Sequence, residues 1–158
     1  MIARLVGSEM CIRDRMNSIE KLISVSVGVS LLYVEDDLTL QQETAQLLRN
    51  FFEKIDLAQN GEEGLELFEP GKYEIIITDI NMPKLNGVEM VKAIRRKDRH
   101  QMIIVISAHD EPHYLIDLIN AGAQYFLSKP IDLTELISIL YEFCVEHQQR
   151  SASLSKRK

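Results

Sequence analysis

The chain has 158 residues, of which 46% are hydrophobic, so it can form one folded core with short extensions. Its formal net charge is −6, with 24 acidic against 18 basic residues, which argues against a general attraction to nucleic acid or anionic membranes. Cys11 and Cys144 are the only cysteines, and their separation excludes a disulfide framework and a cysteine metal motif. The most apolar stretch, residues 22–34, is too short to cross a bilayer, and we expect a cytoplasmic protein.

The two ends differ in character from the middle of the chain. Residues 1–15 show no hydrophobic period, and residues 7–15 resemble a translated sequencing adapter, so we expect a non-native or disordered leader. Residues 16–28 are taken as an N-terminal extension. Residues 148–158 are polar and basic, and we expect a disordered tail. The predicted domain is therefore residues 29–147.

Five short apolar runs predict strands, because such β-branched runs suit a parallel sheet that is buried on both faces. They are residues 29–34, 55–58, 75–79, 102–106 and 125–128. After each run, apolar residues recur at helical spacing and predict an amphipathic helix. The inward residues of the five helices are Leu40, Thr44, Leu47, Leu48 and Phe51; Leu65 and Phe68; Val88, Val91 and Ile94; Leu115, Ile116 and Ile119; and Leu136, Ile139, Leu140 and Phe143.

Side chains that can cap a helix precede several of these segments. Asp37 is placed to cap the first helix, and Asn60 with Glu63 fits a capping box. Asp132 with Glu135 fits another at the last helix. On the third helix the basic residues Arg95, Arg96 and Lys97 should face outward. Strands that alternate with helices imply an α/β fold with a doubly wound parallel sheet.

Polar residues stand just after four of the predicted strands, where ligands bind in open α/β sheets. Glu35 and Asp36 come directly after the first strand, and Asp79 ends the third. Because the carboxyl ends of parallel strands share one edge, these three carboxylates should crowd together. Like charges at such distances need a cation, and oxygen ligands with room for waters suit Mg²⁺.

Two further strand ends add a positive charge and a hydroxyl donor, Lys129 and Ser107. A site with these groups beside a metal fits a phosphoryl group that is attacked by a carboxylate. Each residue also has a structural explanation: acids favour helix N-termini, Ser107 can end a strand, and Lys129 can lie on the surface. The agreement of four separate strand ends favours the functional explanation.

Five short motifs together resemble the receiver domain of bacterial two-component response regulators. They are Val-Glu-Asp-Asp at 34–37, Asp-Ile-Asn-Met-Pro at 79–83, Asn-Gly at 86–87, Ser-Ala at 107–108 and Lys-Pro at 129–130. The resemblance covers about residues 30–146. It implies a flavodoxin-like, doubly wound (βα)5 three-layer sandwich with strand order 2-1-3-4-5.

The resemblance also implies a role for each site residue. Asp79 would be the phosphoacceptor, and Asp79, Glu35, Asp36 and the backbone carbonyl of Asn81 would hold Mg²⁺. The sequence has Glu at position 35 where many receivers have Asp, and both can bind the metal.

The other implied roles concern the bound phosphoryl group and its readout. Ser107 would hydrogen-bond a phosphoryl oxygen, and Lys129 would pair with the acyl phosphate. Phe126 matches an aromatic switch position, for which plain core packing is the alternative. A sensor histidine kinase or a phosphotransfer protein would donate the phosphoryl group, and a downstream protein target would respond.

The resemblance makes the chain a signalling switch rather than an enzyme that turns over a separate substrate. It implies no direct nucleic acid binding by this domain and no membrane contact, and a phosphorylation-dependent homodimer is left open. The alternative is a fragment of a longer response regulator whose output domain is missing.

Three other classes of protein fit the sequence less well. A haloacid-dehalogenase-type phosphatase needs a second Asp where this chain has Asn81. A flavodoxin needs a phosphate-binding loop rich in Ser, Thr and Gly, where Glu35 and the two acids after it would repel phosphate. An interaction module that takes no phosphate stays open, although the set of acids argues against it.

Overall fold

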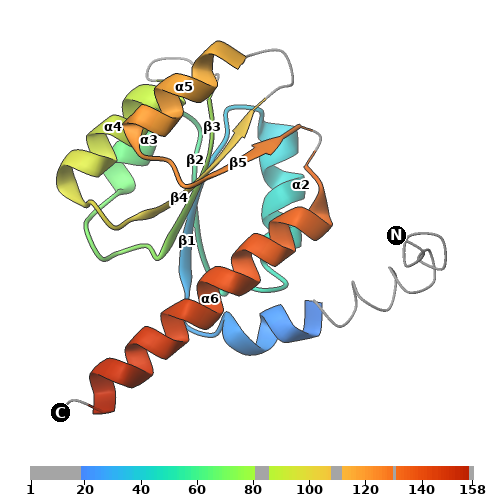
Figure 1. Cartoon of the computed structure of the whole chain (residues 1–158). Coiled ribbons are helices and arrows are strands. Elements are labelled where there is room, and N and C mark those ends of the chain that lie inside the picture. Colours follow the sequence, from blue (N-terminus) through green and yellow to red (C-terminus); the bar gives the residue numbers. More distant parts are fainter. Residues whose placement is uncertain (1–18, 81–85, 108–111, 130, 157–158) are drawn as a thin grey trace, which may run out of the picture. The chain divides into compact units, whose positions relative to one another are not determined.

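The computed structural model describes residues 19–80, 86–107, 112–129 and 131–156, and side chains within these ranges except at 112–115 and 152–156 (Figure 1). The described residues fall into two compact units, one within Gly28–Asp132 and one made of the described parts of Met1–Val27 and Leu133–Lys158. The first unit contains the whole sheet and four helices. The second contains a helical segment, residues 19–25, and the last helix.

The first unit is built on a five-stranded sheet with the order β2-β1-β3-β4-β5, and every pair of neighbouring strands is parallel. This order confirms the predicted flavodoxin-like fold. The strands lie within one residue of the predicted bounds. They are β1 Ser30–Val34, β2 Lys54–Ala58, β3 Ile75–Asp79, β4 Met102–Ser107 and β5 Tyr125–Ser128.

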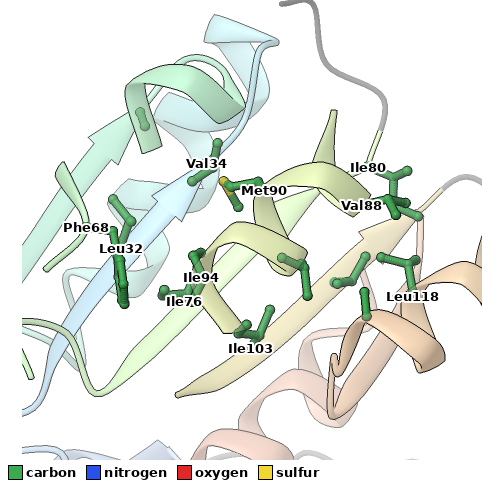
Figure 2. Packing of buried hydrophobic residues seen from close by; sticks show 14 of the residues in the cluster. Leu32, Val34, Phe68, Ile76, Ile80, Val88, Met90, Ile94, Ile103 and Leu118 are labelled. Carbon is green, nitrogen blue, oxygen red and sulfur yellow. The ribbon is translucent and has the colours of Figure 1, made fainter. Parts of the chain in front are cut away.

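Helices of the first unit cover both faces of this sheet: α2 lies on one face, and α3, α4 and α5 lie on the other (Figure 1). Their bounds are α2 Leu38–Leu48, α3 Gly61–Leu67, α4 Gly87–Lys97 and α5 Pro112–Ala121. On the second face, Met90, Val91 and Ile94 of α4 are buried among apolar side chains of β1, β3 and β4 (Figure 2). This burial is the main source of stability expected for a sheet covered by helices.

Side-chain caps begin the helices largely where the sequence predicts them. Asp37 Oδ1 accepts from the Leu40 N–H at 3.1 Å, and Asn60 Oδ1 accepts from the Glu63 N–H at 2.8 Å. The capping box at Asn60 is only half formed, because the Glu63 carboxylate accepts at 3.4 Å from the N–H of Gln59 instead. The helices therefore begin at the predicted residues with one altered hydrogen bond.

α5 presents a different face to the core from the predicted one. The structure buries Leu118 but leaves Ile116 and Ile119 66% and 57% exposed. The prediction that Ile116 and Ile119 face inward is therefore wrong, and the side chain of Leu115 lies outside the described residues. Because α5 is apolar on more than one side, its hydrophobic spacing does not fix which side packs.

Arg95 also departs from the prediction, which placed it in solvent. Its Nε and Nη2 donate to the carbonyl oxygen of Gly122 at 2.9 and 2.7 Å. Gly122 ends α5 with a φ of 102°, a left-handed conformation that glycine adopts without strain. This conformation leaves its carbonyl free to join α5 to α4 through the guanidinium.

In the second unit, α6 extends over Leu133–Lys156, so the structure has helix over residues 148–156 where the sequence predicted a disordered tail. No Gly or Pro occurs after His147 to end the helix, and Arg150 pairs with Glu146 one turn earlier at 3.9 Å. The predicted extension 16–28 is helical over 19–25, with Leu22 buried. The predicted leader, residues 1–15, lies outside the described residues.

Within the described part of the chain, none of the helices combines the length and the apolar character that a membrane crossing requires.

The start of α4 lies directly against the end of β3. The Gly87 N–H donates to the Ile80 carbonyl at 2.8 Å, and a Cβ at Gly87 would lie 2.5 Å from the Asp79 carbonyl oxygen. No real Cβ approaches a backbone oxygen so closely, and backbone cannot yield as a flexible side chain can. The sequence therefore needs glycine here to let α4 begin beside Asp79.

We predict that Gly87→Ala lowers the free energy of unfolding by about 1–3 kcal/mol, because the new methyl group must displace the backbone at Asp79. Urea unfolding measures the loss, and amide NMR shows where the structure moves. Gly71→Ala is the contrasting control, since alanine is strained by its left-handed φ of 83° while no atom lies within 4 Å of its Cβ, so it should lose stability without moving Asp79. Unchanged amide signals of Asp79 and Ile80 in Gly87→Ala would contradict this prediction.

Candidate phosphoacceptor and metal site

The register of β1 with β3 places two acids side by side at the carboxyl edge of the sheet. Val34 pairs with Thr78, so the next residues, Glu35 and Asp79, leave their strands at the same level and on the same face. Both side chains are buried, with Glu35 1% and Asp79 5% exposed. Two adjacent carboxylates in such a position are costly unless positive charge offsets them.

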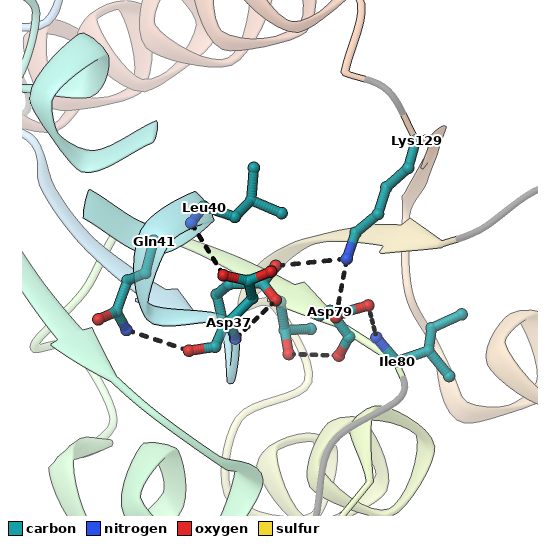
Figure 3. A network of polar contacts seen from close by, with 8 residues as sticks. Asp37, Leu40, Gln41, Asp79, Ile80 and Lys129 are labelled. Carbon is teal, nitrogen blue, oxygen red and sulfur yellow. Dashed lines mark hydrogen bonds and ion pairs between the residues drawn. The ribbon is translucent and has the colours of Figure 1, made fainter. Parts of the chain in front are cut away.

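Lys129 supplies positive charge from the end of β5, which lies on the opposite side of β3 from β1. Ile106 of β4 pairs with both Asp79 and Leu127, and Lys129 lies two residues beyond Leu127 on the same face. Its Nζ lies 3.0 Å from Asp79 Oδ2 and 3.5 Å from Glu35 Oε2 (Figure 3). The lysine thus contacts both buried carboxylates at once.

Backbone N–H groups fix the other oxygen of each carboxylate. Asp79 Oδ1 accepts from the Ile80 N–H at 2.7 Å, and Glu35 Oε1 accepts from the Asp37 N–H at 3.2 Å (Figure 3). Each acid therefore has one oxygen held by the main chain and one oxygen turned toward Lys129.

The charges of this cluster are only partly balanced. Burial and the negative charge of Asp79 raise the pKa of Glu35 to about 7. For Lys129, burial acts to lower the pKa, but the hydrogen bond and charge of Asp79 and the charge of Glu35 outweigh it, and the pKa is raised. The ammonium is thus held in its charged form, yet one lysine does not relieve the strain on Glu35.

The cluster fits a divalent cation. Glu35, Asp36 and Asp79 each offer a carboxylate oxygen, and these oxygens all lie within 4.8 Å of one another. Among the described residues, Glu35 Oε2 has no hydrogen-bond partner although it is buried. Oxygen ligands from two buried carboxylates and one exposed carboxylate, with solvent on one side, are the donor set that Mg²⁺ prefers. Asn81, whose carbonyl was expected as a further ligand, lies outside the described residues.

Gln41 supports this site and was missed by the sequence reasoning. It is buried on α2, and its Nε2 donates to the carbonyls of Glu35 and Ala58 at 3.2 and 2.8 Å. It therefore joins the ends of β1 and β2 directly beneath the acids. Its burial could have been predicted from the sequence, because Gln41 lies on the same face of the helix as the buried Thr44 and Leu48.

Ser107 and Phe126 lie near the same edge of the sheet as Asp79. Each is one position out of phase with Asp79 in the strand pairing, so its side chain leaves the opposite face of the sheet. Ser107 is half-buried at the end of β4, and its carbonyl accepts from the Lys129 N–H at 2.8 Å. Phe126 pairs with Val105 and packs, partly buried, against the cluster around α4. The structure thus brings Glu35, Asp36, Asp79 and Lys129 into one site and places the two predicted switch residues beside it.

Comparisons with known proteins agree with this fold. The response regulator receiver domain model matches residues 31–141, and the chain belongs to this family. It is similar to the N-terminal domain of an uncharacterized protein from Wolinella succinogenes, with 37% identity and a TM-score of 0.70 over 82% of this chain and 99% of that one. It is also similar to the response regulator TrrA from Thermotoga maritima in complex with Mg²⁺-BeF, with 31% identity and a TM-score of 0.64 over 73% and 98% of the two chains.

A curated relative, the transcriptional regulatory protein DltR of Streptococcus agalactiae, is 30% identical over 108 residues. The match covers 68% of this chain and 48% of DltR. The chain therefore spans about half the length of the curated relatives it matches. The matched part is the receiver domain of two-component response regulators.

We predict that the metal-free protein becomes more stable as the pH falls from about 8 to about 5. Because the pKa of Glu35 is raised from 4.5 to about 7, the folded chain takes up a proton in this window while the unfolded chain does not. The gain should reach about 2–3 kcal/mol, measured by urea unfolding in EDTA. Glu35→Gln cannot take up this proton, and a parent curve parallel to that of Glu35→Gln would contradict the prediction.

Proposed function

We propose that this receiver domain is a phosphorylation switch and that Asp79 is its phosphoacceptor. The observation that carries the proposal is the position of Asp79, with one oxygen held by the Ile80 N–H and the other 3.0 Å from the Lys129 ammonium. An oriented carboxylate beside a cation and two further acids is suited to attack phosphorus. Free acids without these partners would repel an incoming phosphoryl dianion.

In the proposed reaction a carboxylate oxygen of Asp79 attacks the phosphorus of a phosphohistidine. An O–P bond forms, the P–N bond breaks, and its electron pair stays on the imidazole nitrogen. Glu35 and Asp36, with Asp79, would hold Mg²⁺, which offsets negative charge on the phosphoryl oxygens. Lys129 would exchange its contact with the Asp79 carboxylate for one with the acyl phosphate that forms.

The readout of this reaction would begin at Ser107. Its hydroxyl would turn toward a phosphoryl oxygen, and the space it leaves would let the Phe126 ring favour an inward rotamer. The neighbouring surface of α5 exposes Ile116 and Ile119, two large apolar side chains that a partner could cover. The change need only shift two pre-existing states by a few kcal/mol.

The phosphoryl donor would be a sensor histidine kinase or a phosphotransfer protein in the cytoplasm. A downstream protein would then bind the phosphorylated domain and respond to the signal. The switch would catalyse its own phosphorylation and dephosphorylation without turnover of a separate substrate. The exposed face of α5 also suits a homodimer that forms on phosphorylation. If the chain is part of a longer regulator, an output domain would receive the signal.

We predict that Mg²⁺ shifts the amide NMR signals of Glu35, Asp36 and Asp79, with weak binding because several waters stay on the ion. Asp36→Asn removes one ligand charge and should weaken this response. Asp37→Asn is the matched control, because it removes the neighbouring charge but not a member of the cluster, and Asn can still cap α2. Equal Mg²⁺ affinity in Asp36→Asn and the parent would place the metal elsewhere.

We predict that acetyl phosphate with Mg²⁺ labels Asp79 as an acyl phosphate that hydroxylamine cleaves. Asp79→Asn should abolish the label, measured by mass spectrometry of the intact chain. Ser107→Ala should keep the label but reduce the chemical-shift changes that accompany it. The proposed cause is that the movement of the Ser107 hydroxyl toward the phosphoryl group lets the Phe126 ring change its rotamer. The assignment of the phosphoacceptor is wrong if Asp79→Asn is labelled as well as the parent.

A further inference from the structure

A buried tyrosine lies on β1 two residues before Glu35, and its hydroxyl forms no hydrogen bond with the described residues. Tyr33 is on β1, fully buried, and its hydroxyl has no partner there. A buried hydroxyl without a partner costs free energy, so its persistence calls for a reason. A phenylalanine in the same place would pack as well at no such cost.

Among the described residues, the other buried side-chain atom without a hydrogen-bond partner is Glu35 Oε2. The Tyr33 hydroxyl can donate a hydrogen bond and Glu35 Oε2 can accept one. Tyr33 and Glu35 are two residues apart in an extended segment, so they leave the sheet on the same face about 7 Å apart along the strand. Side chains on strands lean along the strand direction, which brings the hydroxyl toward the carboxylate. The burial of the ring and the charges of Glu35 and Asp79 raise the pKa of Tyr33, which keeps it a donor.

The Tyr33 hydroxyl lies near Glu35 without forming a hydrogen bond to it, and Lys129 competes with it for the carboxylate. Among the described residues, the Lys129 ammonium lies 3.5 Å from Oε2 and attracts it. A divalent cation among the three acids would repel the ammonium. Glu35 Oε1, which accepts from the Asp37 N–H, would then also face the cation, and Oε2 would need a donor of its own.

We infer that Tyr33 is a positioning residue of the metal site, whose hydroxyl donates to the Glu35 carboxylate when a divalent cation occupies the cluster. This inference rests on the proposed metal binding by Glu35, Asp36 and Asp79. Carboxylates that bind a metal are themselves oriented by hydrogen bonds from behind, and loss of such a partner lowers metal affinity. Thr44 of α2 is the other polar group beside the hydroxyl, and a permanent Tyr33–Thr44 pair is the competing arrangement.

The test is a Mg²⁺ titration of the parent and Tyr33→Phe, monitored by calorimetry and by tyrosine fluorescence. The chain has five Tyr and no Trp, so tyrosine emission is directly visible, and a hydrogen bond to a carboxylate quenches it. Tyr73→Phe is the matched control, because it removes a buried hydroxyl that bonds Asp56 on the edge strand β2. Metal-free melting curves of each variant show that it is folded.

Mg²⁺ should quench the emission of the parent and of Tyr73→Phe but not that of Tyr33→Phe. Tyr33→Phe should bind Mg²⁺ roughly tenfold more weakly, yet melt at the same or a higher temperature without metal, because no hydrogen bond is lost. If Tyr33 only packed in the core, Tyr33→Phe would bind Mg²⁺ with the same affinity as the parent. Equal Mg²⁺ affinity in Tyr33→Phe and the parent overturns the inference while the proposed function stands, whereas no Mg²⁺ binding by the parent overturns both.

Discussion

Parallel strand pairing forces carboxylates into contact that would otherwise repel one another. Glu35 and Asp79 leave adjacent strands at the same level, both nearly inaccessible to solvent, and Asp36 adds a third charge within 4.8 Å. A slip by one residue would move every side chain to the opposite face of the sheet, so the packing of the helices on both faces fixes this register. The fold therefore holds the acids together at a cost, and Lys129 offsets that cost only in part.

The surrounding structure can be understood as support for this cluster. Gln41 joins the ends of β1 and β2 beneath Glu35, and the backbone N–H groups of Asp37 and Ile80 each fix one carboxylate oxygen. Gly87 lets α4 begin directly against the end of β3. With these constraints the acids cannot turn away from each other, so relief must come from bound positive charge. That is the condition under which a metal ion and a phosphoryl group become favourable partners.

Much of this arrangement could be predicted from the sequence, because it depends on strand periodicity and on the residues just after each strand. The five strands and the meeting of Glu35, Asp79 and Lys129 result from short-range pattern and parallel topology, whereas the strand order was implied by the resemblance to receiver domains. The supporting contacts could not be predicted in the same way. Gln41 bonds a carbonyl seventeen residues away, and no local pattern encodes that distance.

The errors have equally physical causes. The rotation of α5 was missed because several of its sides are apolar, so packing chose Leu118 over Ile116 and Ile119. The role of Arg95 was missed because its partner, the Gly122 carbonyl, becomes available only through a left-handed turn on another helix. The helical tail was missed because a polar composition was interpreted as disorder, although no residue there stops a helix.

Locating a bound paramagnetic ion tests most directly whether the crowded acids form a metal site. Mn²⁺ takes the same oxygen ligands as Mg²⁺ and broadens amide NMR signals near it. The chain offers a second acidic surface, a pocket lined by Glu62, Glu63 and Glu66 of α3, which has exposed charge but no crowding of buried acids. At low Mn²⁺ we expect the signals of Glu35, Asp36 and Asp79 to broaden first, while those of α3 persist. Broadening that begins at α3 would contradict the claim that the crowded acids at the strand ends create the metal site.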